Sequence, residues 1–139
     1  MNRFRSKFAP HWVGGFYDET YRANVDIIWP VRAVHIAGYV KRRTGITDYK
    51  LDDDFGAKTV ECCNPEGGEI NIICLRTWSL NDPRDVAMLA HEVFHVAEHI
   101  LSRRNITLTS GQTEPYAYLI ESIMRRCLTL LDTKRPIQK

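Results

Sequence analysis

The sequence predicts a single α+β domain, and three observations carry that prediction. Two β-prone stretches, GAKTVECC and EINIICLRTW, flank a loop that contains a proline and two glycines. After them come two segments with apolar residues at helical spacing, one over about 83–103 and one from about 113 onward. The chain has 139 residues, a length that suits one domain with a core of its own. We therefore expect residues 1–139 to fold as one unit.

The first third of the chain predicts extended structure followed by a helix. Residues 1–20 are expected to form irregular or short extended structure around a turn at Gly14–Gly15. Residues 21–29 are β-prone at their end, and a proline then begins a helix over about 31–43. Thr44–Gly45 ends this helix, because glycine readily adopts the left-handed conformation found at helix C-termini.

The rest of the chain predicts a hairpin and two longer helices. The loop Asn64–Gly68 joins the two β-prone stretches, which therefore pair in a short, mostly antiparallel sheet. Asp82 followed by Pro83 is a helix-start signal, with a side-chain cap and then a proline at the first helical position. This helix runs to about Arg103. The last helix begins near Thr113 and ends before the polar C-terminal tail.

Composition and charge exclude several classes of function. The 19 basic and 17 acidic residues give a net charge of +2, too balanced for a surface that binds phosphate backbones, so no nucleic acid partner is expected. No segment approaches the roughly 20 apolar residues of a membrane span, and the N-terminus lacks the apolar stretch of a secretory signal. We expect no membrane partner, a cytoplasmic location, and four cysteines present as reduced thiols that mostly pack as small hydrophobes.

The chemistry of the chain is concentrated in one pentad, His91-Glu92-Val93-Phe94-His95, within the helix that begins at Pro83. Residues four apart lie on one helix face, about 6 Å apart along the axis, so two imidazoles can hold one ion. Glu92 points about 100° around the helix and is therefore placed to act as a general base beside the metal. Imidazole nitrogen suits Zn²⁺, the expected cofactor, although the pattern also admits manganese, iron or cobalt.

A catalytic zinc ion needs three protein ligands and one water, so a third ligand is expected. Glu114 is preferred, because it begins the next helix after a break long enough to turn the chain back across the first. Glu121, Glu98 and His99 are the alternatives, but His99 lies a further turn along a straight helix, too far to complete a tetrahedron. A different reading is that the two histidines are structural, because a bare H-E-x-x-H also arises by chance.

HEVFHVAEH followed by TEPYAYLIE resembles the gluzincin class of zinc metallopeptidases over about residues 69–131, and E-P-x-A-Y-L is similar to small metallopeptidase-like proteins of bacteriophages. The resemblance implies a zincin-like fold, in which a sheet packs on the H-E-x-x-H helix and a C-terminal glutamate helix supplies Glu114. It implies that EINIICLRTW is the edge strand beside the cleft, where an extended substrate could pair. Larger gluzincins have an acidic residue where this chain has Tyr118, so Tyr118 or Glu121 would orient a metal-binding histidine. A phage-encoded protein would act in the bacterial host cytoplasm.

Together these residues predict a zinc-dependent metallopeptidase that hydrolyses peptide bonds of a protein or peptide substrate. Glu92 would take a proton from a metal-activated water and pass it to the leaving amine. Tyr116, Tyr118 and His99 are candidates for stabilising the oxyanion. The alternative is a catalytically silent, zinc-stabilised structural or protein-binding module, such as a phage assembly component or a modulator of a host protein. The residues leave the substrate and the oligomeric state open.

Overall fold

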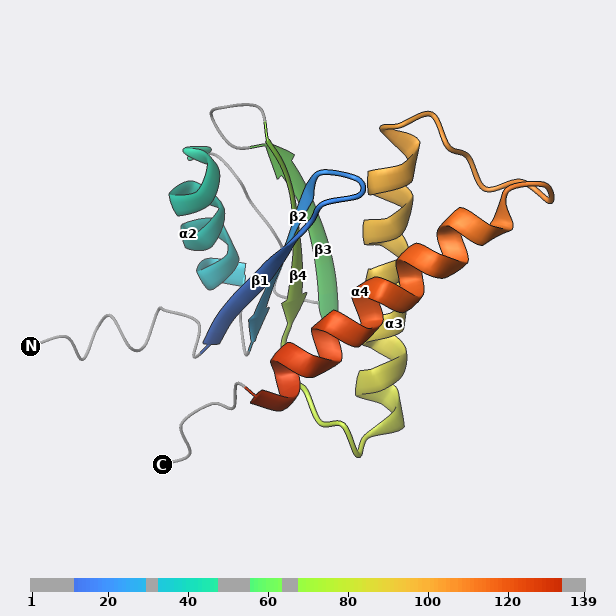
Figure 1. The fold of residues 1–139 in the computed structure, drawn as a ribbon. Helices are drawn as coiled ribbons and strands as arrows, with labels where there is room; N and C mark the ends of the chain where they lie inside the picture. The colour runs from blue at the N-terminus through green and yellow to red at the C-terminus, as the bar shows by residue number, and fades with distance from the viewer. Residues whose placement is uncertain (1–11, 30–32, 48–55, 64–67, 134–139) are drawn as a thin grey trace, which may run out of the picture.

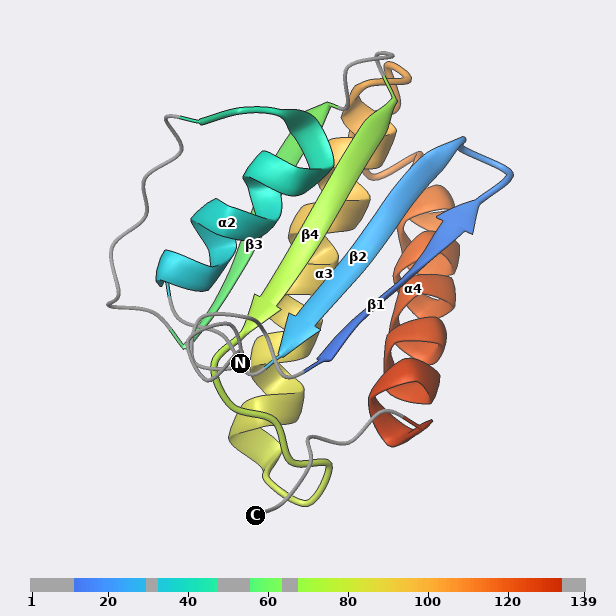
Figure 2. The same ribbon diagram turned by 90° about the vertical axis from the view of Figure 1, so that its left-hand side faces the viewer.

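The computed structural model describes residues 12–29, 33–47, 56–63 and 68–133, which form three helices and a four-stranded mixed sheet. α2 covers one face of the sheet, whereas α3 and α4 cover the other (Figures 1 and 2). The predicted α+β class is therefore confirmed. The elements are β1 (Trp12–Asp18), β2 (Ala23–Trp29), α2 (Ala33–Thr44), β3 (Ala57–Cys63), β4 (Glu69–Leu75), α3 (Pro83–Ser102) and α4 (Thr113–Thr133).

The strand order in the sheet is β1-β2-β4-β3. β1 pairs antiparallel with β2, and β3 pairs antiparallel with β4, as predicted for the hairpin. β2 and β4 are parallel, with Asn24 opposite Ile70 and Ile28 opposite Cys74. The sheet is thus mixed but mostly antiparallel, as expected.

The expectation that EINIICLRTW forms the edge strand is wrong. Its strand, β4, lies between β2 and β3, and every residue of β4 is buried. A continuous apolar run is typical of a strand covered on both faces, and here α2 covers one face and α3 the other. The edge strand on this side of the sheet is β3, which contacts α3.

The expected turn at Gly14–Gly15 is also absent, because both glycines lie within β1. Gly15 stands opposite Asp26 of β2, and a β-carbon at this position would lie 2.5 Å from Asp26 Oδ1 and 2.9 Å from the Val25 carbonyl oxygen. Glycine is therefore needed here for close approach to a carboxylate rather than for a turn. The chain turns later, between Asp18 and Ala23, where Asp18 Oδ1 accepts a hydrogen bond from Tyr21 N at 2.8 Å.

Each face of the sheet has its own hydrophobic core. On the α2 side, the buried side chains come from α2 and from alternate positions of β2, β3 and β4. On the other side, apolar residues of α3 and α4 pack on β2 and β4 in a larger cluster. Because strand side chains alternate between the two faces, neighbouring residues of β3 belong to different environments. This alternation decides which β3 residues can reach α3.

The predicted ends of the helices are largely as observed. α2 begins at Ala33 and ends at Thr44, and Gly45 follows with φ of 80° while its N–H donates to the Lys41 carbonyl at 2.8 Å. The expected start of this helix, at residue 31, lies outside the described residues. At the start of α3, Asp82 Oδ1 accepts from Arg84 N at 2.9 Å. None of the helices among the described residues combines the length and apolar character that crossing a membrane requires.

Candidate functional site

The two histidines of the pentad face each other on the side of α3 that borders β3. His91 Nε2 and His95 Nε2 are 3.1 Å apart, and the two rings meet edge to face with centroids 4.8 Å apart. Two nitrogens bound to one zinc ion at 2.0–2.1 Å with tetrahedral angles would be separated by about 3.4 Å. The observed spacing differs from this by a few tenths of an ångström and is also that of a direct hydrogen bond between the two rings, so the pair is compatible with a shared divalent ion or with such a bond.

Glu92, between these histidines in sequence, turns inward toward the sheet and is buried with 6% of its surface exposed. Its Oε1 accepts a hydrogen bond from Thr59 Oγ1 of β3 at 3.1 Å. The same hydroxyl lies 3.2 Å from the main-chain oxygen of Glu92. Oε2 makes no hydrogen bond with any of the described residues. The structure thus leaves one oxygen of a buried carboxylate available for proton transfer.

A cavity of about 320 Å³ joins these groups. Its lining combines the imidazoles of α3 and the Glu92 carboxylate with residues of the edge strand β3. A pocket that gathers several titratable side chains beside a strand edge is the usual setting for a binding or catalytic site. Its lining residues are Lys58, Thr59, His91, Glu92, His95 and His99.

His99, predicted to support a metal-binding residue or to stabilise the oxyanion, lines this cavity and stacks against His95 with ring centroids 6.5 Å apart. Its Nδ1 lies 3.4 Å from Glu61 Oε2 of β3 but is not aligned for a hydrogen bond, so this buried atom has no hydrogen-bond partner among the described residues. The other oxygen of Glu61 accepts a hydrogen bond from Arg103. His99 Nε2, on the opposite side of the ring from Nδ1, is therefore the nitrogen that can face the cavity.

The remaining predicted site residues lie on α4. Tyr116 is buried, its hydroxyl donates to the Ile106 carbonyl at 3.3 Å, and its ring lies 6.3 Å from that of Phe94. Phe94 in turn lies 6.2 Å from His95. The Phe94 ring thus stands beside both the histidine pair and the second turn of α4, which limits how closely that part of α4 approaches the pair.

Glu114, Tyr118 and Glu121 are exposed on α4 and do not line the cavity. Among the described residues, no set of three or more His, Cys, Asp or Glu side chains is grouped as a metal site. The structure therefore brings His91, His95 and Glu92 together but does not bring Glu114 to them. The third ligand stays a prediction.

Three of the four cysteines are small buried groups. Cys62, Cys74 and Cys127 are buried and Cys63 is exposed, and all four are free thiols. Burial raises the pKa of Cys62 to about 11 and that of Cys127 to about 12. Burial, followed by the nearby Glu92, also raises the pKa of Cys74. These three thiols stay protonated near neutral pH and are poor nucleophiles and poor metal ligands.

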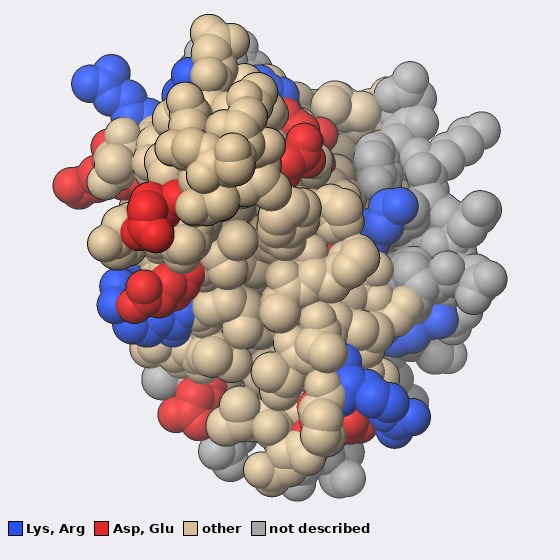
Figure 3. Space-filling view, turned by 90° about the vertical axis from the view of Figure 1, so that its right-hand side faces the viewer, with Lys and Arg blue, Asp and Glu red and all other residues tan. Residues whose placement is uncertain are grey.

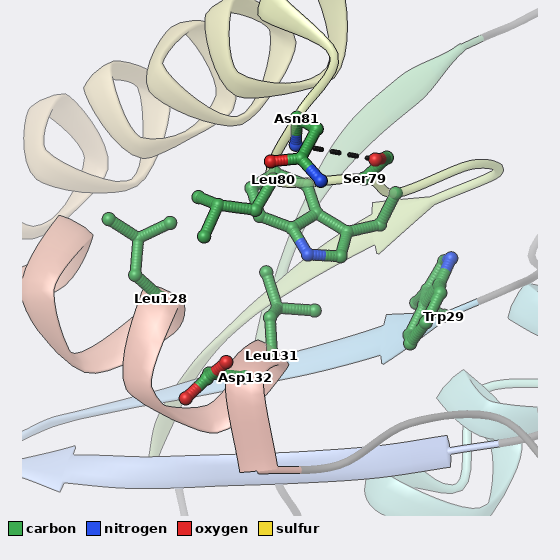
Figure 4. A pocket seen from close by; sticks show the side chains of 8 residues that line it. Trp29, Ser79, Leu80, Asn81, Leu128, Leu131 and Asp132 are labelled. Atoms are coloured by element: carbon green, nitrogen blue, oxygen red, sulfur yellow. Dashed lines mark hydrogen bonds between the residues drawn. The ribbon is translucent and has the colours of Figure 1, made fainter.

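A larger cavity of about 490 Å³ lies where the end of β2, the segment before α3 and the last turns of α4 meet (Figure 4). Its walls include the indoles of Trp29 and Trp78 and the side chains of Leu80, Leu128 and Leu131. It contains no histidine and none of the predicted site residues. We assign the candidate site to the smaller cavity because chemistry, rather than size, distinguishes the two.

Sequence reasoning missed the contribution of β3 to the site. Thr59 and Glu61 alternate with Val60 and Cys62, which pack on the α2 side. Alternating polar and apolar residues over 59–62, next in sequence to an apolar strand, signal an edge strand whose polar side faces something other than core. AKTVECC has this pattern, which places Thr59 on the polar side of the strand.

Comparison with known proteins adds no relative. No family model, no curated protein and no solved structure matches the chain. The function must therefore be argued from the residues and their geometry.

Proposed function

We propose that this protein is a zinc-dependent metallopeptidase. The observation that carries the proposal is the convergence of His91 Nε2 and His95 Nε2, 3.1 Å apart, beside a buried Glu92 carboxylate with one unengaged oxygen. Two imidazoles one turn apart with an adjacent glutamate are the donor set and base of the H-E-x-x-H peptidases. The gluzincin resemblance of the sequence and its small zincin-like fold belong to the same proposal.

In this proposal His91 and His95 would hold the ion. The sequence favours Glu114 as the third protein ligand, although in the structure Glu114 is exposed on α4 and does not line the cavity. A bound zinc ion supplies an activated water and polarises the substrate carbonyl. Glu92 accepts the proton of that water at Oε2 and delivers it to the leaving amine, while Oε1 stays bound to Thr59. His99 Nε2 is the candidate group for the oxyanion, since Tyr116 is engaged with Ile106 and Tyr118 is exposed.

The surroundings of the cavity support an extended peptide as substrate. β3 is an edge strand and contributes Lys58 and Thr59 to the cavity, so a peptide pairing with its free edge would pass beside the histidines. The face formed by α3 and α4 is largely uncharged in its described part, with Lys, Arg, Asp and Glu mainly around the rim (Figure 3). Such a face suits a protein partner better than a polyanion.

A proteolysis assay with a chelator control tests the proposal. Purified protein loaded with zinc should cleave fluorescently labelled casein that has been denatured, and a zinc chelator should stop the cleavage until zinc is restored. Glu92→Gln should retain zinc without cleaving, because glutamine keeps the shape of the side chain but cannot accept the proton. Equal cleavage by wild type and Glu92→Gln would contradict the proposal. Zinc binding with no cleavage by either protein would instead favour the silent structural or protein-binding module.

A further inference from the structure

The hydroxyl of Thr59 lies within hydrogen-bond distance of two oxygens of Glu92. Val60 and Cys62 of β3 pack toward α2, so strand alternation directs Thr59 to the opposite face, toward α3. There its Oγ1 lies 3.1 Å from Glu92 Oε1 and 3.2 Å from the Glu92 main-chain oxygen. A hydroxyl has one proton to donate, and here both acceptors belong to the same residue. The Thr59 proton therefore bonds to Glu92 alone, through its carboxylate, its backbone oxygen or both in a shared bond.

We propose that Thr59 is a positioning residue that orients Glu92 for proton transfer, an inference that rests on the proposed function. The hydrogen bond to Oε1 fixes the rotation of the carboxylate and leaves Oε2 as the oxygen that receives the proton. A carboxylate released from this bond could rotate, and a displacement of about 1 Å can reduce catalysis about 100-fold. Because Thr59 lies on the edge strand, the strand proposed to receive substrate also orients the base.

The variants that test this inference are matched. Thr59→Val removes the hydroxyl but keeps the β-branched shape, whereas Thr59→Ser keeps the hydroxyl and removes a methyl group. Thr77→Val is the control, because Thr77 Oγ1 lies 3.0 Å from Asp85 Oδ1 in another hydroxyl-to-carboxylate hydrogen bond to a buried residue of α3. Asp85 does not line the candidate cavity. The control thus removes the same kind of bond from the same helix, away from the proposed chemistry.

Initial rates over a range of labelled-casein concentrations separate positioning from binding. We expect Thr59→Val to lower kcat by roughly 10- to 100-fold with little change in KM, since the hydroxyl acts on the base and not on the substrate. Thr59→Ser should restore most of kcat, and Thr77→Val should leave it unchanged. A wild-type kcat for Thr59→Val would overturn the inference. So would a rise in KM alone, which would place Thr59 in substrate binding, or an equal loss in Thr77→Val.

A second measurement does not depend on activity. Urea unfolding of the metal-free protein is compared for wild type, Thr59→Val, Glu92→Ala and the double variant. If Thr59 holds Glu92, the two losses of stability are not additive, because either substitution alone already removes the bond. Additive losses would overturn the contact itself. If the losses in the variants are non-additive but the wild-type protein cleaves no casein, the contact stands and the peptidase proposal is rejected. The two failures can therefore be distinguished.

Discussion

Two buried carboxylates on opposite faces of the sheet show how one fold assigns different tasks to the same chemical group. Asp26, on the α2 side, accepts hydrogen bonds at Oδ2 from Tyr39 Oη at 2.7 Å and from Arg43 Nε at 2.8 Å, while Arg43 Nη2 approaches Oδ1 at 3.5 Å. Glu92, on the α3 side, engages one oxygen with one hydroxyl and lines a cavity with histidines. A fully paired carboxylate is part of the scaffold, whereas a half-paired one beside a cavity can exchange a proton.

The largest expected effect is on turnover. Glu92→Gln should lower kcat by about 100- to 10,000-fold, the range typical for loss of a general base. Asp26→Asn should leave kcat close to that of wild type, because Asp26 lies on the other face of the sheet. Steady-state cleavage of labelled casein by both variants checks this contrast. A comparable loss of kcat in Asp26→Asn would show that the two carboxylates are not separated in function.

The next effect is on stability. Asp26→Asn replaces the charged acceptor of Tyr39 and Arg43 with a neutral amide, and we expect the free energy of unfolding to fall by about 2 kcal/mol. This is less than the loss for a fully buried pair, because the Arg43 side chain is 37% exposed and water screens part of the interaction. Urea unfolding measures the change. A stability equal to that of wild type would contradict the scaffold role of Asp26.

The α2 side also predicts a loss of stability at alkaline pH. Burial raises the pKa of Cys62 from 9.0 to about 11. The unfolded chain therefore releases this proton first, and the stability that is fully present below pH 9.0 falls as pH rises toward 11. At pH 10 the loss of unfolding free energy due to Cys62, relative to a pH well below 9.0, amounts to roughly 1–2 kcal/mol. The free energy of unfolding, measured with urea at several pH values across this range, should fall less steeply with pH for Cys62→Ala than for wild type. An equal fall in both proteins would show that the thiol does not contribute.

The pattern of the sequence predicts most of the scaffold because its signals are local. The cap at Asp82, the proline after it and the apolar stripe of the last helix each act within a few residues, and α3 and α4 begin where these signals predict. The hairpin between β3 and β4 follows in the same way from its loop. The parallel pairing of β2 with β4 joins residues more than 40 positions apart, and no local signal predicts it.

The candidate site likewise has a part that local sequence signals predict and a part that depends on tertiary packing. His91 and His95 are one helical turn apart, so their convergence follows from helix geometry alone. Thr59 and Glu61 reach the site because β3 is an edge strand beside α3, a placement that the alternation in its sequence hints at but that strand order decides. Glu114 depends on how α4 crosses α3, and packing around Phe94 and Tyr116 influences that crossing. Tertiary packing therefore decides the parts of the site that come from outside the pentad.

The central claim is that His91 and His95 hold one divalent ion beside Glu92, and equilibrium dialysis against zinc tests it most directly. Wild type and Glu92→Gln should each bind one zinc ion per chain, because Glu92 is a base rather than a ligand. His95→Ala should bind zinc at least roughly 100-fold more weakly, since one of two converging nitrogens is lost. Wild-type protein that binds no zinc, or zinc binding that His95→Ala leaves unchanged, would contradict the claim.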